Sequence, residues 1–123
     1  MPKTEIMFFR REDGSIPFLD WAENLAPAER VRCDVRLRRL ADMGHALRRP
    51  EVDYLRDGIY EIRTRSGTIQ LRILYFFHGF HAVVLSHGLV KKEAIPDREI
   101  DLAVARRQLV TRNSNLHCHR GTI

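Results

Sequence analysis

The sequence predicts an α+β fold in one domain, because helical spacing of apolar residues precedes and follows a central run of strand-like segments. Glycine-containing turns divide this central run, residues 51–90, into an antiparallel meander. A chain of 123 residues is long enough to bury a single core without disulfides or metals. We expect the domain to span residues 1–112 and residues 113–123 to form a flexible tail.

The N-terminal part is predicted to hold one strand and two helices. Residues 4–10 (TEIMFFR) form the strand, and Ser15, after the break at Gly14, is expected to cap the first helix. An apolar stripe with i, i+3, i+4 and i+7 spacing supports this helix: Phe18, Trp21, Ala22 and Leu25. A second helix begins at Pro27 and closes at Gly44.

The second helix has an alternative interpretation as a strand, since apolar residues alternate from Val31 to Leu37. The length of the segment, Pro27 and the closing Gly44 favour the helix. Its other faces carry a set of basic residues: Arg30, Arg32, Arg36, Arg38 and Arg39. These arginines either form a solvated charged face or contact RNA, the ribosome or an acidic protein.

Three strands and a last helix follow. The strands are residues 59–65, 68–77 and 80–90, joined by two-residue loops at Ser66-Gly67 and His78-Gly79, where glycine supplies the positive φ of a tight turn. Pro96 and Asp97 then open a helix whose apolar stripe is Ile100, Ala103 and Val104.

These loop lengths predict a cluster of polar side chains on one face of the sheet. The first row is Arg63, Gln70 and His87, the next row is Glu61 and Arg72, and Arg65 flanks them. The same face is expected to continue with the buried residues Leu74, Phe76, Val83 and Leu85. Tyr60 and Tyr75 fall on the opposite face and are expected in the core.

Arg72 interrupts an apolar strand, and a buried charge requires a partner or a ligand. Arg72 can pair with Glu61, and it can also bind a phosphate; these two roles of Arg72 are compatible. His87 suits proton transfer near neutral pH, with a structural or merely exposed histidine as the alternative. Lys91 and Lys92 follow the same strand as substrate ligands or as surface lysines.

The composition favours a polyanionic partner, with a net charge of +5, a pI of about 9.8 and basic residues that are mostly arginine. No apolar run approaches the ~20 residues of a membrane span, and the N-terminus has no signal pattern. Cys33, expected to be buried, and Cys118 stand alone, as is typical of a reducing compartment. We therefore expect a cytoplasmic protein with no membrane partner.

RNA cleavage without a metal needs a base for the ribose 2′-hydroxyl, an acid for the leaving oxygen and cations for the phosphorane charge. We assign catalytic roles to Arg63, Arg72 and His87. Substrate-binding roles are assigned to Arg65, Gln70, Lys91 and Lys92. No cofactor or metal is expected, since His117-Cys118-His119 lacks a spaced pair of further ligands.

Several segments occur together and in order: FFRREDGSIPFLDWAENL, LADMGHALRRPEVDYL, DGIYEIR, LRILYFF and LSHGLVKKEAIPDREIDLAVAR. Over residues 5–107 the chain resembles the HigB-like, phage-derived branch of the RelE/ParE toxins. It departs from that pattern at Gln70-Leu71, where an aromatic residue is common, and at Leu89, where Phe is frequent. The first departure bears on base stacking or substrate choice.

The resemblance implies a RelE-like fold, with two N-terminal helices packed on a small antiparallel sheet of about four strands and a C-terminal helix. It also implies inhibition of translation by mRNA cleavage, often on the ribosome, and neutralisation by an antitoxin, commonly a helix-turn-helix protein encoded nearby. Arg63, Arg72, His87, Lys91 and Lys92 take the recurrent basic positions of the family. The alternatives are a non-nucleolytic toxin that binds a target such as DNA gyrase, and a partner-binding protein without catalysis.

Overall fold

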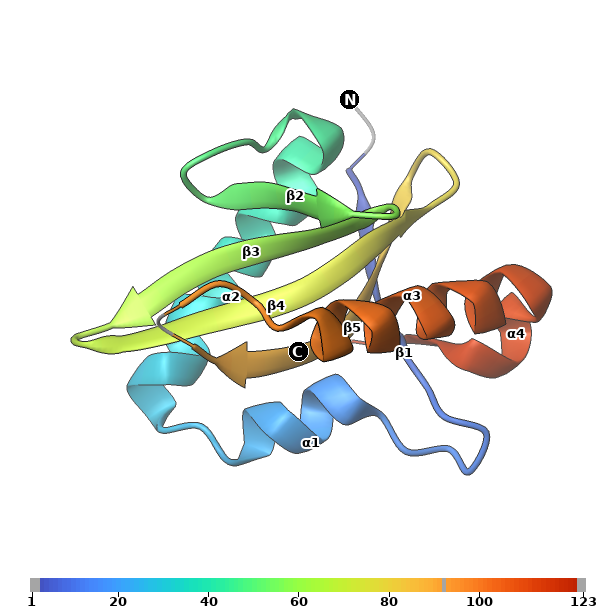
Figure 1. The fold of residues 1–123 in the computed structure, drawn as a ribbon, viewed down its shortest axis with the longest axis horizontal. Helices are drawn as coiled ribbons and strands as arrows, with labels where there is room; N and C mark the ends of the chain where they lie inside the picture. Colours follow the sequence, from blue (N-terminus) through green and yellow to red (C-terminus); the bar gives the residue numbers. More distant parts are fainter. Residues whose placement is uncertain (1–2, 92, 122–123) are drawn as a thin grey trace.

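The computed structural model describes residues 3–91 and 93–121, which form one mixed β-sheet with helices on both faces (Figure 1). The helices are α1 (Pro17–Glu23), α2 (Pro27–Met43), α3 (Asp97–Arg112) and the short α4 (Ser114–His117), with a 3-10 turn, η1 (Gly44–Ala46), after α2. The strands are β1 (Glu5–Phe9), β2 (Val52–Arg56), β3 (Ile59–Ser66), β4 (Ile69–His78), β5 (Ala82–Val90) and β6 (Cys118–Arg120).

The strands lie in the order β2-β3-β4-β5-β1-β6. β2 to β5 form successive antiparallel pairs, whereas β1 runs parallel to β5 and antiparallel to β6. The α+β class is confirmed, but the expected antiparallel sheet of about four strands is in fact a mixed sheet of six. Both additional strands, β2 and β6, are short edge strands, which carry little local pattern in the sequence.

The C-terminal residues are ordered further than the sequence indicates. Residues 114–120, expected within a flexible tail, form α4 and β6, and Cys118 pairs with Phe9 on β1. The amide of Arg10 donates to the carbonyl of His117 over 2.9 Å. Local patterns do not reveal this pairing, because it joins the two ends of the chain.

Both predicted N-terminal helices are confirmed, and the strand interpretation of residues 31–37 is excluded. Cys33 is buried on α2, as expected, while Val31 and Val35 are 61% and 52% exposed. Ser15 does not cap α1. Its hydroxyl donates instead to Asp13 Oδ1 over 2.7 Å, and the helix begins two residues later with no side-chain cap.

The register of the β3–β4 hairpin differs by two residues from the prediction. Ser66 pairs with Ile69, so the loop is 67–68 rather than Ser66-Gly67. Arg63 therefore lies opposite Arg72, and Arg65 lies opposite Gln70. An even shift keeps every side chain on its predicted face, because side chains alternate with a period of two.

The β4–β5 hairpin contains a bulge that the sequence analysis misses. Its loop has three residues, 79–81, and the register changes between Leu74, which pairs with His87, and Tyr75, which pairs with Leu85. Ser86 is the extra residue. Since the bulge compensates for the longer loop, His87 still lies on the face that carries Leu74.

Between the loop and the bulge, the longer loop displaces the pairing of β4 and β5 by an odd number of residues. An odd displacement moves side chains to the opposite face of the sheet. Val83 and Leu85 pack in the core formed with α1 and α2, on the face opposite Leu74 and Phe76, so their predicted face is wrong. Leu74 and Phe76 are buried under α3, as predicted.

Two apolar cores flank the sheet. The first joins α1 and α2 to one face and includes Phe8, Phe18, Leu37 and Tyr75. Tyr60 is half-buried and stacks on Tyr75 with ring centroids 5.5 Å apart, so both tyrosines are on the predicted face. The second core packs the stripe of α3, including Ile100 and Ala103, on the other face. Within the described residues, no helix is both long and apolar enough to cross a membrane.

Candidate functional site

Glu61 and Arg72 form a buried ion pair on the α3 side of the sheet. Nη1 of Arg72 donates to both carboxylate oxygens of Glu61, over 2.9 and 3.1 Å. The two side chains are only 10% and 2% exposed. Because an unpaired buried charge is very costly, Glu61 is what allows an arginine at this place in an apolar strand. The Nε atom of Arg72 is also buried, and it has no hydrogen-bond partner among the described residues.

Arg63 extends this pair towards the sheet edge. Its Nε donates to Glu61 Oε1 over 2.6 Å and its Nη2 donates to Asp53 Oδ2 over 2.9 Å. Arg49 completes the row, with Nε 3.0 Å from Asp53 Oδ1. The hydrogen bond from Arg49 holds the pKa of Asp53 below its usual value, against the opposing effect of burial. Three guanidinium groups thus share two carboxylates, which leaves one net positive charge.

A cavity of about 430 Å³ opens beside Arg63. Its lining residues are Arg36, Pro50, Glu51, Arg63, Thr64, Arg65 and Gln70. The charge of Arg36 is compensated by Glu51 at 2.7 Å, whereas Arg65 makes no ion pair with any described residue. A rigid sheet with a partly uncompensated guanidinium lining is suited to a phosphate group, since the planar guanidinium matches phosphate geometry.

His87 belongs to a second polar cluster, formed between β5 and α3. Its Nδ1 lies 2.7 Å from Ser86 Oγ, and its Nε2 lies 3.0 Å from Glu99 Oε1 in the first turn of α3. Nη1 of Arg106 donates to the Ser86 carbonyl over 3.1 Å and lies 3.2 Å from His87 Nδ1. The bulge at Ser86 is what directs the polar groups of two successive residues toward the same helix.

These contacts assign the proton on the His87 ring. A guanidinium can only donate, so Nδ1 is the acceptor and the proton resides on Nε2, which donates to Glu99. Burial lowers the pKa of His87, the charge of Arg106 lowers it further, and Glu99 opposes both effects. Burial is also the main cause that lowers the pKa of Arg106 to about 10. In this state the neutral His87 ring fastens α3 to the sheet.

Comparison with known families places these residues in a wider group. The sequence matches the family described as Phage derived protein Gp49-like (DUF891) over residues 20–108, well over half of the chain. A search of curated proteins finds no match. The chain belongs to the Gp49-like family. This family is part of the RelE/ParE-like toxin superfamily, its members are commonly toxins of toxin–antitoxin systems, and it thereby suggests an antitoxin partner.

The region that matches the Gp49-like family holds both polar clusters. It includes β2 to β5 and most of α3, and therefore Glu61, Arg72, His87, Glu99 and Arg106. It leaves out β1, α4 and β6. The superfamily named by the sequence resemblance is thus confirmed on the same part of the chain that carries the candidate site.

The structure brings together only some of the site residues that the sequence predicts. Arg63 and Arg72 meet at Glu61, and Arg65 and Gln70 line the cavity beside them. His87 shares their face of the sheet, but its ring is held by Ser86 and α3 and has no hydrogen bond to either arginine. The amide of Lys91 donates to the Gln70 carbonyl over 3.1 Å, whereas Lys92 lies outside the described residues.

The sequence alone does not reveal the partners of His87. Neither Glu99 nor Arg106 is among the site residues that the sequence predicts. Arg106 lies three residues after Ala103 and four before Val110, on the buried stripe of α3. A basic residue on an apolar stripe is a signal that could have identified it, because a buried charge requires partners.

Most of the basic residues of α2 are engaged within the protein. Arg36 and Arg39 both pair with Glu51, at 2.7 and 2.6 Å, and Arg38 pairs with Asp34 at 3.0 Å. Arg39 and Arg38 are 47% and 78% exposed, so these pairs form a solvated charged face.

The His117-Cys118-His119 tract serves packing in the described part of the chain. His117 is buried, its Nδ1 lies 2.9 Å from the Arg10 carbonyl, and its ring stacks on Phe9 with centroids 5.5 Å apart. Among the residues that the structure describes, no three His, Cys, Asp or Glu side chains are grouped so that they could hold a metal.

Proposed function

We propose that this Gp49-like protein is the HigB-like toxin of a type II toxin–antitoxin system. It stops translation by cutting mRNA on the ribosome in the cytoplasm. The observation that carries the proposal is that Arg63, Arg65 and Gln70 line one cavity beside the buried Arg72–Glu61 pair. Membership of a toxin superfamily supports it. An adjacent gene for a helix-turn-helix antitoxin is part of the proposal.

The proposed chemistry is attack by a ribose 2′-oxygen on the neighbouring phosphorus. The bond from phosphorus to the 5′-oxygen breaks, a base removes the 2′-proton and an acid protonates the 5′-oxygen. The products are a 2′,3′-cyclic phosphate and a 5′-hydroxyl. Arg63, 37% exposed at the cavity, holds the non-bridging oxygens, and Arg72 supports it through Glu61. These guanidiniums supply the positive charge for which other nucleases use a metal.

His87 is proposed as the acid or base, and this role requires a local movement. Its Nε2 proton now points to Glu99, and its Nδ1 faces Ser86 and Arg106. To exchange a proton with RNA, the ring must release Glu99, so the first turn of α3 must shift away from β5 when the substrate binds. Release of one hydrogen bond is a small cost beside the binding energy of several phosphates.

A non-nucleolytic function is the second candidate, and one specific observation favours it. Arg72 and His87 are both satisfied by groups of the protein itself, as is typical of structural polar clusters. Under this alternative, the protein acts by binding a target such as DNA gyrase, or binds a partner without any catalysis.

Induced expression in a bacterial host, followed by primer extension on total mRNA, separates the two candidates. The variants are Arg63→Gln, Arg72→Ala and, as a matched control that removes one charge from the exposed α2 surface, Arg32→Gln. We expect new mRNA ends with the wild type and with Arg32→Gln, and their loss with Arg63→Gln. Growth arrest with intact mRNA in the wild type would refute the nuclease proposal and favour the binding alternative.

A further inference from the structure

We propose that an aromatic surface beside β2 stacks a base of the single RNA strand that binds at the Arg63 cavity. The aromatic surface consists of Tyr54, Tyr60, Phe77 and His45. The proposal rests on the proposed function for the identity of the strand, and it adds a place where that strand is held. A stacked base anchors the strand through a contact that is separate from the phosphate contacts.

The four rings of the aromatic surface form a continuous row on the sheet face that carries α1 and α2. Tyr54 lies opposite Tyr60, which in turn lies opposite Tyr75, so their side chains share one face. The ring centroids of Tyr54 and Tyr60 are 5.0 Å apart, and those of Tyr60 and Phe77 are 5.3 Å apart. The His45 ring stacks on Phe77 at 3.6 Å, with planes inclined by 14°. Thus β2, β3, β4 and η1 each contribute one ring.

This part of the sheet face is open to solvent, unlike the core beside it. Tyr54 is 54% exposed, Tyr60 and Phe77 are half-buried, and His45 is exposed. The Tyr54 ring is nonetheless held in place, because the backbone amide of Gly58 donates to its hydroxyl over 3.0 Å. An exposed ring with a fixed orientation favours stacking, since a ligand does not have to order it on binding.

A cavity of about 390 Å³ gives the base a place beside two of these rings. It is lined by Leu47, Arg48, Arg49, Val52, Asp53, Tyr54 and Tyr60. Small-molecule sites commonly have volumes of about 300–1,000 Å³. Leu47 and Val52 are buried members of the core, so the cavity has an apolar wall next to the rings. An apolar and aromatic lining suits the flat face of a base.

Arg48 supplies a positive charge for a phosphate of the same strand. It is exposed, and its guanidinium makes no ion pair with any described residue. Burial raises the pKa of Tyr75, Tyr60 raises it further, and the nearby charge of Arg48 lowers it. The guanidinium therefore lies close to the rings. An uncompensated positive charge beside stacked rings complements a polyanion that carries flat bases.

Arg49 connects the aromatic surface to the Arg63 cavity. It lines the cavity beside Tyr54, and its Nε and Nη2 donate to the two carboxylate oxygens of Asp53 over 3.0 and 3.1 Å. Asp53 also accepts a hydrogen bond from Arg63. Neighbouring residues of the segment 48–53 line the two cavities, so the cavities adjoin at the edge of the sheet. A strand that crosses this segment can place a base on the rings and an adjacent phosphate at Arg63.

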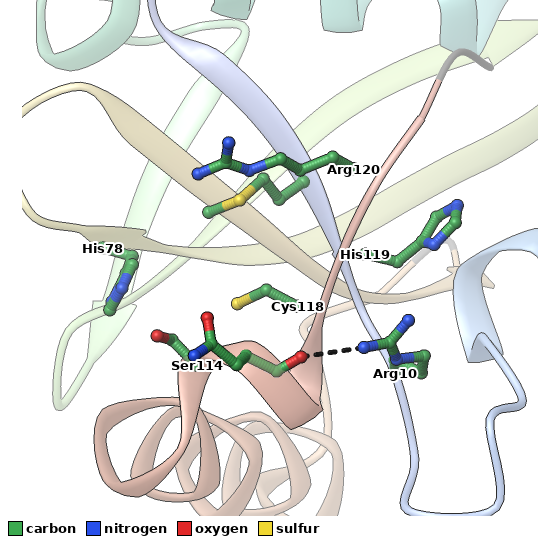
Figure 2. A pocket seen from close by; sticks show the side chains of 8 residues that line it. Arg10, His78, Ser114, Cys118, His119 and Arg120 are labelled. Carbon is green, nitrogen blue, oxygen red and sulfur yellow. Dashed lines mark hydrogen bonds between the residues drawn. The ribbon is translucent and has the colours of Figure 1, made fainter.

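A larger cavity, of about 480 Å³, lies between β1, β6, α4 and the end of β4 (Figure 2). Its basic groups are not gathered around one point, because Figure 2 draws Arg10 and His119 across β6 from His78 and Arg120. The His119 ring stacks on Phe8 instead, with centroids 6.2 Å apart. The combination of open rings and an uncompensated arginine is thus found beside β2 and not at this larger cavity.

Fluorescence anisotropy with labelled RNA and the purified full chain tests the proposal. The probes are a short 2′-O-methyl RNA, which cannot be cut by its own 2′-oxygen, and a strand of the same length in which abasic spacers replace the bases. The variants are Tyr54→Leu, which removes the ring, Tyr54→Phe, which keeps it, and Arg48→Gln. Arg32→Gln on α2 is the control for loss of charge, and thermal unfolding checks that each variant is folded.

We expect the wild type to bind the strand with bases at least about fivefold more tightly than the abasic strand, as for one stacked base. Tyr54→Leu should abolish this preference, and Tyr54→Phe should keep it. Arg48→Gln should weaken the binding of both strands and reduce its salt dependence, because a phosphate contact is lost. Arg32→Gln should have a smaller effect on both quantities.

Equal binding of the strand with bases by the wild type and Tyr54→Leu would overturn the proposal. This result is expected if a protein partner covers the aromatic surface. The probes contain no bond that the proposed chemistry can cut, so the two proposals fail separately. A preference for bases that depends on Tyr54, without new mRNA ends in cells, would refute cleavage and keep the aromatic surface. New mRNA ends together with equal binding would refute the aromatic surface alone.

Discussion

Glu61 on β3 and Arg72 on β4 are joined by two hydrogen bonds, of 2.9 and 3.1 Å, inside the sheet face that α3 partly covers. The two residues are diagonal neighbours, since Glu61 lies opposite Leu74 and Arg72 lies opposite Arg63. The carboxylate of Glu61 therefore receives hydrogen bonds from two arginines at once. Stability and the proposed phosphate-binding site depend on the same carboxylate.

The first prediction concerns that carboxylate. Glu61→Gln removes the charge that compensates Arg72, and we expect a loss of about 3 kcal/mol in the free energy of unfolding, typical of a broken buried pair. Urea denaturation measures it. The double variant Glu61→Leu with Arg72→Met replaces the pair by apolar groups and should be more stable than Glu61→Gln. A double variant that is less stable than Glu61→Gln would contradict this account of the pair.

The second prediction concerns Arg63 in catalysis. Arg63→Gln should leave the protein folded, because the side chain is 37% exposed and Arg72 still compensates Glu61. We expect the rate of RNA cleavage to fall by about 10²-fold or more, as when one donor to a developing anion is removed. Single-turnover cleavage with purified protein checks this rate, with Arg32→Gln as control. An unchanged rate would remove Arg63 from the proposed mechanism.

The third prediction follows from the low pKa of His87. In the unfolded chain His87 regains its ordinary value of 6.5, whereas the folded protein keeps the ring neutral to lower pH. Below pH 6.5 the unfolded state therefore binds more protons, and stability falls as the pH decreases. The contribution of this one group reaches at most about 1.4 kcal/mol one pH unit below its unfolded pKa.

Comparison of the wild type with His87→Gln isolates this effect from the other histidines. Urea denaturation at pH 7.5 and about pH 5.5, conditions that span the ordinary histidine pKa, should show a larger loss of stability for the wild type than for the variant. Equal losses in the two proteins would mean that His87 is not held neutral by burial and Arg106.

The fourth prediction tests the packing between α1 and β5. A methyl group on Gly88 would collide with the Trp21 ring. Gly88→Ala should therefore cost about 1–3 kcal/mol, the usual penalty for overpacking. Thermal unfolding measures it, and the same substitution in a Trp21→Leu background should cost clearly less. An identical cost in both backgrounds would show that the ring is not the obstacle.

The fifth prediction concerns the two thiols. Burial raises the pKa of Cys33 to about 12, and the residue is only 4% exposed. Cys118 also has a raised pKa because of burial, but it is half-buried and lines a cavity. Ellman's reagent should modify Cys118 first and Cys33 only on unfolding. Fast reaction of the Cys118→Ser variant would contradict the burial of Cys33.

Apart from the short edge strand β2, the sequence predicts the elements between residues 17 and 112 well, because apolar spacing and glycine turns are local signals. Faces were correct for Arg63, Arg72 and His87 although both registers were wrong, since an even shift preserves the face. The bulge at Ser86 could not be predicted, because no special residue marks it, and it reversed Val83 and Leu85. The parallel β1–β5 pair and β6 depend on contacts between distant segments, which local patterns do not contain.

For the site, charge type was predictable but charge partners were not. An arginine inside an apolar strand predicts a buried charge that needs a partner, and Arg72 does form a buried ion pair with Glu61. His87 is not part of this ion pair, because its ring is held by Glu99 and Arg106. Both residues belong to α3, which packs on the sheet from a later part of the chain. The docking angle of that helix cannot be derived from the pattern of either segment alone.

The most direct test of the central claim is the chemical nature of the new RNA ends. Attack by a 2′-oxygen leaves a 5′-hydroxyl on the downstream fragment, whereas hydrolysis by an activated water commonly leaves a 5′-phosphate. RNA from cells that express the wild type should therefore yield ends that ligate to an adapter only after treatment with polynucleotide kinase, and Arg63→Gln should yield none. Ends that ligate without kinase, or no new ends during growth arrest, would contradict the account.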